Sequence, residues 1–291
     1  MWMILGSDGQ LGQSLQLVLS ERNIPFFACN KGTLDITDES ACFNFFEEYK
    51  PKYVVNCAAW TAVDLAEDFE EECSRINCLG ARNVTKASKR VGSVLVHIST
   101  DYVFSGDSSV PYEEDAATNP ASIYGSTKLC GEEAVKHEYS EGSYIVRTAW
   151  LYSQFKKNFV KTMITKALSN SPVRVVDDQL GQPTHAGDLA LHIVELAQSG
   201  AKFGIYHGTN SGSASWYELT REIYDALDVD LNLVTAVPTS EYPTKAKRPQ
   251  YSVLAHTATL KTSVAPMRDW KSALRESLPA VRECVEMEAR A

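Results

Sequence analysis

The stretch Met1–Gly12, MWMILGSDGQLG, decides the fold, because a short apolar run leads directly into three glycines, at Gly6, Gly9 and Gly12. A helical pattern follows at once. Glycine permits a tight strand-to-helix turn and close approach of the backbone to a pyrophosphate, and the helix N-terminus offers free N–H groups to the anion. The spacing is G-x-x-G-x-x-G rather than the common G-x-G-x-x-G. Its place between the first strand and the first helix nevertheless predicts a dinucleotide site.

Apolar runs alternate with helical stretches through the first half of the chain. The expected strands are Met1–Leu5, Pro25–Cys29, Tyr53–Cys57, Val94–Ser99 and Tyr144–Thr148. The expected helices are Gln10–Ser20, Asp38–Tyr49, Glu70–Val91 and Ala121–Glu138. This alternation predicts βαβ units, and hence a parallel sheet with helices on both faces. We therefore expect an α/β fold, a Rossmann-type doubly wound parallel sheet with a smaller C-terminal substrate-binding lobe.

The second half is less regular. Its expected strands are Val173–Val176 and Ile205–His207, and its expected helices are Gly187–Gln198 and Ser215–Leu227. The last of these opens with a capping box in Ser215-Trp216-Tyr217-Glu218. We expect a dinucleotide-binding domain over residues 1–150 and mainly a substrate-binding lobe over 151–291. Later strands can still return to the first sheet.

Composition excludes several classes of protein. The chain has 291 residues, 44% hydrophobic and 22% charged, which is typical of a globular protein rather than a disordered one. A net charge of −9 argues against a nucleic-acid partner. The absence of an apolar run near the ~18 residues of a membrane span argues against a membrane partner. Without a signal-peptide pattern at the N-terminus, we expect a cytoplasmic protein.

The seven cysteines and six histidines show no metal-ligand spacing, so no metal site is predicted. A cytoplasmic location favours reduced thiols for all seven cysteines.

The end of the second expected strand bears on the cofactor. Sites that prefer NAD place an Asp or Glu there to hold the ribose 2′-hydroxyl. This chain has Cys29, Asn30 and Lys31 instead, and its first carboxylate is Asp35. A cation in place of an anion accommodates a 2′-phosphate, so we expect NADPH to be used at least as well as NADH. The alternative is that Lys31 is only a solvated loop residue.

Two further segments lie where strands of such a sheet should end, at the edge where ligands bind. They are HISTDYVFSG, residues 97–106, and ASIYGSTKL, residues 121–129. In the second, Tyr124 and Lys128 are four apart and share one helix face. A nearby ammonium lowers the pKa of a phenol from its usual value near 10, which suits the phenol to acid–base chemistry. The Thr100 hydroxyl can then hold a substrate carbonyl. The alternative to a catalytic role is that Tyr124 and Lys128 are an exposed pair on the helix surface.

A second Tyr-x-x-x-Lys pair, Tyr152 and Lys156, shows how weak this spacing is on its own. We interpret that second pair as chance or surface.

In combination the motifs carry a family resemblance. The glycine loop, NCAAWTAVD, STDYVFSG, YGSTK, RTAWLYS, DQLGQPT and RPQYS occur in the order seen in extended short-chain dehydrogenase/reductases. Over roughly residues 3–275 the set resembles the dTDP-4-dehydrorhamnose reductase family. That resemblance implies NAD(P)H-dependent reduction of the C4 keto group of dTDP-4-dehydro-6-deoxy-L-mannose (dTDP-4-dehydro-L-rhamnose) to dTDP-L-rhamnose, the last step of dTDP-rhamnose biosynthesis.

The resemblance also implies roles for single residues. Thr100 assists the carbonyl, Tyr124 transfers the proton, and Lys128 holds the nicotinamide ribose. Asp101 and Trp150 contact the nucleotide-sugar substrate. Around the cofactor, the implied contacts are Gly9, Gln10 and Leu11 at the pyrophosphate, Asn30, Asp35 and Ile36 at the adenosine, and Ala58, Ala59, Trp60 and Ile98 along the channel.

For the substrate diphosphate, Arg248 is the expected partner, because a guanidinium suits phosphate oxygens.

The chain departs from the family pattern at two positions. The strand end Cys29-Asn30-Lys31 differs from the ALD-type ending of some members, which leaves the preference between NADPH and NADH open. Some members carry a glutamate in the first helix that joins a magnesium-bound dimer contact, and Ser14 stands there in this chain. We therefore expect neither that metal nor that dimer, and a homodimer of another kind stays open.

Several alternatives remain. A nucleotide-sugar dehydratase would carry Glu after Asp101, where this chain has Tyr102. Epimerases retain NAD tightly and lack the LDITD and RTAWLY context. A reductase of another nucleotide 4-keto-6-deoxysugar stays open. So does a non-catalytic subunit resembling the regulatory β subunit of methionine adenosyltransferase, although the joint presence of Thr100, Tyr124 and Lys128 favours an enzyme.

Overall fold

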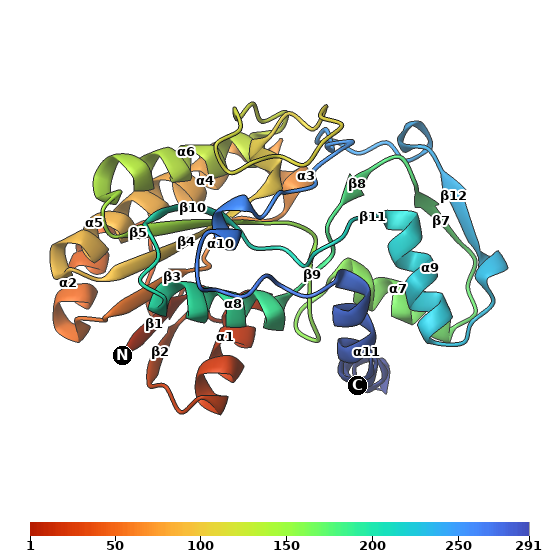
Figure 1. Cartoon of the computed structure of the whole chain (residues 1–291), viewed down its shortest axis with the longest axis horizontal. Helices are drawn as coiled ribbons and strands as arrows, with labels where there is room; N and C mark the ends of the chain where they lie inside the picture. Colours follow the sequence, from red (N-terminus) through yellow and green to blue (C-terminus); the bar gives the residue numbers. More distant parts are fainter. Residues whose placement is uncertain (291) are drawn as a thin grey trace.

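A parallel six-stranded sheet forms the centre of the computed structural model, which describes residues 1–290 (Figure 1). The strand order is β10-β5-β4-β3-β1-β2. The strands are β1 (Trp2–Leu5), β2 (Phe26–Cys29), β3 (Tyr53–Asn56), β4 (Val94–Thr100), β5 (Ser143–Thr148) and β10 (Gly204–His207). Because all neighbouring pairs are parallel, the carboxyl ends of these strands meet at one edge of the sheet.

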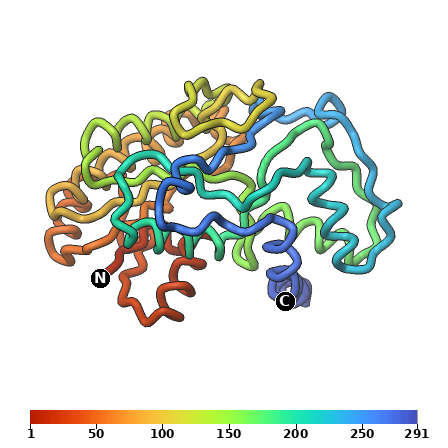
Figure 2. The backbone as a smooth tube through the Cα atoms, viewed as in Figure 1, coloured from red at the N-terminus to blue at the C-terminus, as the bar shows by residue number. Residues whose placement is uncertain are grey.

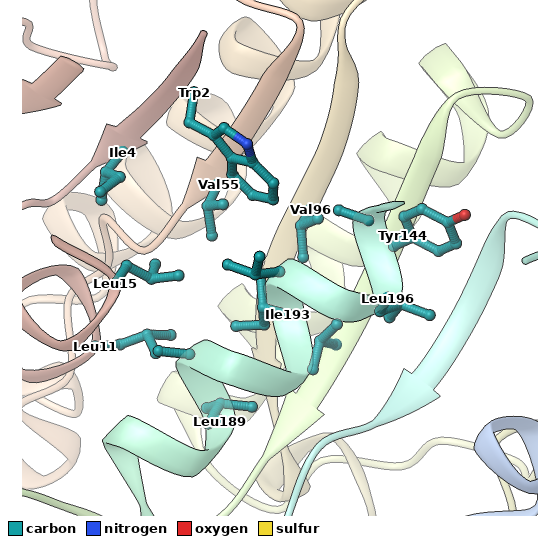
Figure 3. Packing of buried hydrophobic residues seen from close by; sticks show 14 of the residues in the cluster. Trp2, Ile4, Leu11, Leu15, Val55, Val96, Tyr144, Leu189, Ile193 and Leu196 are labelled. Carbon is teal, nitrogen blue, oxygen red and sulfur yellow. The ribbon is translucent and has the colours of Figure 1, made fainter. Parts of the chain in front are cut away.

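Side chains alternate between the two faces of the sheet, and helices cover each face. Trp2 and Ile4 pack with α1 and α8 on one face, as the buried cluster in Figure 3 shows. Met3 and Leu5 pack with α2, α5 and α6 on the other. These helices are α1 (Gln10–Glu21), α2 (Glu39–Tyr49), α5 (Ala81–Val91), α6 (Ile123–Tyr139) and α8 (Ala186–Gln198). The predicted doubly wound sheet is therefore confirmed.

The expected helix over Glu70–Val91 is one continuous helical stretch with an irregular centre. It consists of α4 (Glu70–Ser74), a π-helical segment, η1 (Arg75–Gly80), and then α5. Periodicity did not predict the π-helical turn. Such turns are rare and frequently lie at functional sites. Here it carries Asn77, whose contacts are described with the site.

The second lobe lies beside the sheet, at the right in Figure 2. It has its own core, formed chiefly by α7, α9 and α11. Its helices are α7 (Phe159–Leu168), α9 (Trp216–Ala226) and α11 (Trp270–Arg290). Its strand pairs are β6 (Leu151–Tyr152) with β9 (Thr184–His185), β7 (Val173–Val176) with β12 (Val234–Val237), and β8 (Leu180–Gly181) with β11 (Ala214–Ser215). Between these segments the chain returns to the central sheet as α8 and β10, so residue 150 does not divide the molecule cleanly.

Short elements complete the chain. They are α3 (Val63–Ala66), η2 (Asp101–Val103), η3 (Leu231–Leu233), η4 (Thr239–Glu241) and α10 (Thr257–Leu260). The capping box expected at Ser215 is confirmed, because its hydroxyl accepts from Glu218 N and the Glu218 carboxylate accepts from Ser215 N. Among the described residues, no helix is long and apolar enough to span a membrane.

The expectation of seven reduced cysteines is wrong for two of them. Cys78 of η1 and Cys130 of α6 form a disulfide. The two helices pack side by side with these Cα atoms 5.2 Å apart, within the range that a disulfide bridges. The compartment argument could not reveal this contact, because the two cysteines lie 52 residues apart in sequence.

Candidate active site

A cavity of about 550 Å³ lies at the carboxyl ends of the sheet strands, between the sheet and the second lobe. The glycine loop, the ends of β4 and β5, the start of α6 and the start of α7 all contribute to its wall. The predicted site residues that line it are Gly9, Gln10, Leu11, Gly12, Ala59, Ile98, Thr100, Asp101, Tyr124, Lys128 and Trp150. These predicted residues, which come from several motifs, thus meet at one cavity, as expected for a ligand beyond the carboxyl ends of an α/β sheet.

The glycine loop has the geometry that a dinucleotide needs. Gly6 has φ +74°, and a Cβ atom on it would lie 2.7 Å from the backbone nitrogen of Ala58. A side chain there would therefore separate β1 from the loop after β3. The Gln10 side chain leaves the loop, donates to the Leu151 carbonyl at 3.3 Å and accepts from Asn158 at 2.9 Å. Gln10 thus joins the glycine loop to the second lobe.

A second cavity of about 300 Å³ adjoins the first at Gly9, Cys57 and Ala59. It contains Asn30, Asp35 and Ile36, which were expected around the adenosine, together with the predicted cofactor contacts Gly6, Lys31 and Ala58. Asp8 and Arg75 also line it, and sequence reasoning missed both. Arg75 lies on η1, outside any motif. The Asn30 side chain donates to Asp8 at 3.1 Å, so an amide stands where NAD-preferring sites place an acid.

Two cations lie close to Asp35 in this cavity. The pKa of Asp35 is lowered, first by hydrogen bonds from Thr37 and further by the charges of Lys31 and Arg75. Lys31 and Arg75 can donate charge-assisted hydrogen bonds to a 2′-phosphate on the adenosine ribose, in a cavity that Asp8 and Asp35 also line.

Removing both cations tests this fit. We expect the double variant Lys31→Gln/Arg75→Gln to weaken NADPH binding by about tenfold, because charge-assisted hydrogen bonds at an exposed site are lost. Its affinity for NADH should stay within about threefold, because NADH has no 2′-phosphate to lose contacts. Titration of both cofactors by fluorescence gives the two dissociation constants. An equal loss for NADH and NADPH would contradict the assignment.

The predicted reacting groups come from the neighbouring elements β4 and α6. Thr100 ends β4, and Tyr124 and Lys128 lie on consecutive turns of α6, which Ser122 caps by accepting from Gly125 N. Thr100, Tyr124 and Lys128 are all buried, and Tyr124, the most exposed of them, is 9% exposed. The Lys128 ammonium donates to the Ile98 carbonyl at 2.6 Å. A phenol, a hydroxyl and an ammonium therefore line one wall of the cavity.

The expectation that Lys128 lowers the pKa of the Tyr124 phenol is wrong. Burial raises that pKa, and only the interaction with Thr100 opposes the rise. The Lys128 ammonium is directed at the Ile98 carbonyl. At neutral pH the phenol therefore keeps its proton, which is the form that can donate to a developing alkoxide.

Burial also lowers the pKa of Lys128, to about 8, against the opposing effect of Glu132. The ammonium is therefore charged below about pH 8 and loses its charge as the pH rises through that value. If it donates to cofactor hydroxyls, the dissociation constant for NADPH should rise above pH 8. We expect Kd, measured by fluorescence between pH 6.5 and 9.5, to be flat on the acid side and to increase on the alkaline side. A constant Kd to pH 9.5 would contradict this role for Lys128.

Asp101 follows Thr100 and is 2% exposed. The Thr100 hydroxyl donates to its carboxylate at 3.0 Å. Burial raises the pKa of Asp101 to about 6. Near neutral pH it is therefore a buried hydrogen-bond acceptor beside the phenol and can receive a substrate hydroxyl.

An aromatic wall closes the side of the cavity that belongs to the second lobe. The rings of Trp150 and Trp216 stack with centroids 3.5 Å apart and planes 7° apart, and Phe159 packs on Trp216. A Cβ on Gly181 would lie 2.4 Å from the Trp150 ring, so the glycine of DQLGQPT makes room for this indole. Trp150 was expected at the substrate from the family resemblance, whereas Trp216 was noted only within the capping box that opens α9.

Two predicted residues lie outside both cavities. Trp60 lines neither, and Asn77 of η1 instead holds its backbone, accepting from Trp60 N at 2.8 Å. Arg248 forms an ion pair with Asp64 at 2.6 Å, donates to the Tyr102 hydroxyl at 3.3 Å and lines a separate cavity. The roles of Trp60 and Arg248 in binding stay predictions.

Ser14, which stands where some family members carry a glutamate, is buried and donates to the Gln10 carbonyl at 3.0 Å.

The chain is similar to curated enzymes over nearly its whole length. The chain is 42% identical to a dTDP-4-dehydrorhamnose reductase of Streptomyces griseus, over 96% of this chain and 93% of the relative. It is 40% identical to a dTDP-4-keto-6-deoxy-D-glucose reductase of Streptomyces niveus, over 96% of each.

The chain is also similar to solved structures. That of a dTDP-4-dehydrorhamnose reductase from Bacillus anthracis in complex with NADP is 39% identical and has a TM-score of 0.91, with 96% of this chain and 98% of that chain covered. The family model of the RmlD substrate binding domain matches residues 1–283. Because that match spans nearly the whole sequence, the chain belongs to the RmlD substrate binding domain family.

Proposed function

We propose that the protein is an NADPH-dependent reductase of the C4 ketone of dTDP-4-dehydro-L-rhamnose, forming dTDP-L-rhamnose. One observation carries this proposal: Thr100, Tyr124 and Lys128 line the same cavity, which adjoins a second cavity where Lys31 and Arg75 can bind a 2′-phosphate. Family membership supports the reaction, since relatives 35–42% identical are named dTDP-4-dehydrorhamnose reductases.

Each residue has a defined part in the proposed reaction. Bound NADPH supplies a hydride to the ketone carbon. Thr100 orients the ketone oxygen by hydrogen bonding, and Tyr124 donates its proton to that oxygen. Lys128 holds the ribose hydroxyls, and the aromatic wall at Trp150 excludes water on the opposite side. A cytoplasmic location and a homodimer remain part of the proposal.

A second ketone is a specific alternative. The Streptomyces niveus relative is named for dTDP-4-keto-6-deoxy-D-glucose and is 40% identical, close to the 42% of the Streptomyces griseus reductase. Identity therefore does not separate the two substrates. Both require the same C4 reduction and differ in the configuration of the sugar ring.

The two ketones can be offered side by side with NADPH, and each product identified by NMR. We expect kcat/KM to be higher for dTDP-4-dehydro-L-rhamnose, with dTDP-L-rhamnose as the product. A higher kcat/KM for the D-glucose-derived ketone would favour the alternative. If the protein turns over neither ketone and binds a methionine adenosyltransferase tightly, the result would favour a regulatory subunit over an enzyme.

A further inference from the structure

The charges in the main cavity are few. Within the described residues, its lining contains three cations, Lys128, Lys156 and Lys157, and one carboxylate, Asp101. Lys128 lies on α6 and donates to the Ile98 carbonyl. Lys156 and Lys157 stand apart from it, on the loop between β6 and α7. In a chain of net charge −9, this loop gives the cavity a local excess of positive charge.

Neither of these two ammonium groups is neutralised by a neighbour in the part of the chain that the structure describes. The nearby Lys161 makes the contrast: it is buried and bonded to both Glu288, at 2.5 Å, and the Gln154 carbonyl, at 3.3 Å. Arg248, the cation expected at a diphosphate, is likewise paired, with Asp64. Lys156 and Lys157 are exposed to solvent where they line the cavity, so a ligand there can contact both without breaking an ion pair.

The loop that carries the two lysines is fixed in place. Asn158 donates to the Ser153 carbonyl at 2.8 Å and to the Gln10 side chain at 2.9 Å. Lys156 has φ +52°, a conformation that costs energy for a residue with a Cβ. Strained backbone is maintained where the surrounding contacts over-determine it, often at ligand sites. These contacts hold both lysines at the cavity wall.

We propose that Lys156 and Lys157 bind the diphosphate of the nucleotide-sugar. This inference rests on the proposed function, because the substrate must carry a diphosphate. The glycine loop and the N-terminus of α1 already provide a cradle for the cofactor pyrophosphate. The opposite wall of the cavity, which belongs to the second lobe, then has to neutralise the second diphosphate. The sequence-based interpretation of Lys156 as chance or surface holds for its exposure, since the side chain is exposed. Lys156 also lines the cavity, whereas Tyr152 is 1% exposed.

Thymidine 5′-diphosphate is the direct probe, with binding followed by isothermal calorimetry on the full chain. The variants are Lys156→Asn, which removes the charge while tolerating the left-handed backbone, and Lys157→Gln. We expect each to raise Kd for the probe by about tenfold and the double variant to raise it further, because a charge-assisted contact is lost in each case. Lys157→Arg should stay within about threefold of the wild type.

Two controls make the result specific. Lys166→Gln, at the exposed far end of α7, should leave Kd for thymidine 5′-diphosphate unchanged. Kd for NADPH should be unchanged in all the variants. Loss of NADPH affinity with intact probe binding would move the lysines to the cofactor and overturn the proposal, as would no change for either ligand. A wild-type protein that binds NADPH but not the probe would contradict the proposed function itself, and this inference with it.

Discussion

Replacing Tyr124 by Phe should lower kcat by 10²–10⁴-fold, the usual effect of losing a positioned acid–base group. The phenol is buried in the cavity wall and keeps its proton, because burial raises its pKa. Phenylalanine retains the ring that packs edge-on against Tyr102 and removes only the hydroxyl. The loss should therefore appear in the chemical step, measured as kcat at saturating NADPH and ketone.

The matched control for this variant is Tyr139→Phe at the other end of α6, outside the cavity. It should leave kcat within about twofold. NADPH affinity should be similar in both variants, because neither change removes a cation or alters the glycine loop. A Tyr124→Phe enzyme with kcat within tenfold of the wild type would contradict the role of the phenol.

The second large effect concerns stability. Glu132 lies one turn after Lys128 and accepts from Arg147 of β5 through both carboxylate oxygens, at 2.9 and 2.7 Å. Ser99 of β4 donates to the same carboxylate at 2.5 Å. The Glu132 and Arg147 side chains are at most 1% exposed. This ion pair therefore attaches the helix that carries the reacting groups to the sheet.

Glu132→Gln should lower the free energy of unfolding by about 3–5 kcal/mol, because it leaves the Arg147 charge buried without a counter-ion. Denaturant titration of the purified variants measures this. Glu133→Gln removes an exposed charge on the same helix and should cost less than about 1 kcal/mol.

The double variant Glu132→Leu/Arg147→Met should recover much of the loss, since replacing both charges removes the uncompensated one. A loss below 1 kcal/mol for Glu132→Gln would contradict the account of this pair.

The sequence was most informative where one physical requirement dominates. The buried strands are continuous apolar runs, and the observed ends of the predicted strands lie within a residue of the expected ones. The second lobe was harder to predict. Helix α7 is rich in residues without a strong helical preference, and α11 contains Pro279, so neither was expected.

The candidate site divides in the same way. Thr100, Tyr124 and Lys128 could be predicted because they lie within motifs whose order along the chain carries the family resemblance, and all three line the cavity. Arg75 and Lys157 were missed because they belong to no motif, and only tertiary packing brings them to the cavities. The sequence also could not predict that Asp64 neutralises Arg248, because the two residues lie 184 positions apart along the chain.

The most direct test of the central claim is NADPH consumption by the purified protein with enzymatically prepared dTDP-4-dehydro-L-rhamnose. We predict that one NADPH is oxidised for each dTDP-L-rhamnose formed, and that NADPH serves at least as well as NADH. Binding of NADPH without any oxidation in the presence of the ketone would contradict the claim that this cavity is a ketone reductase site.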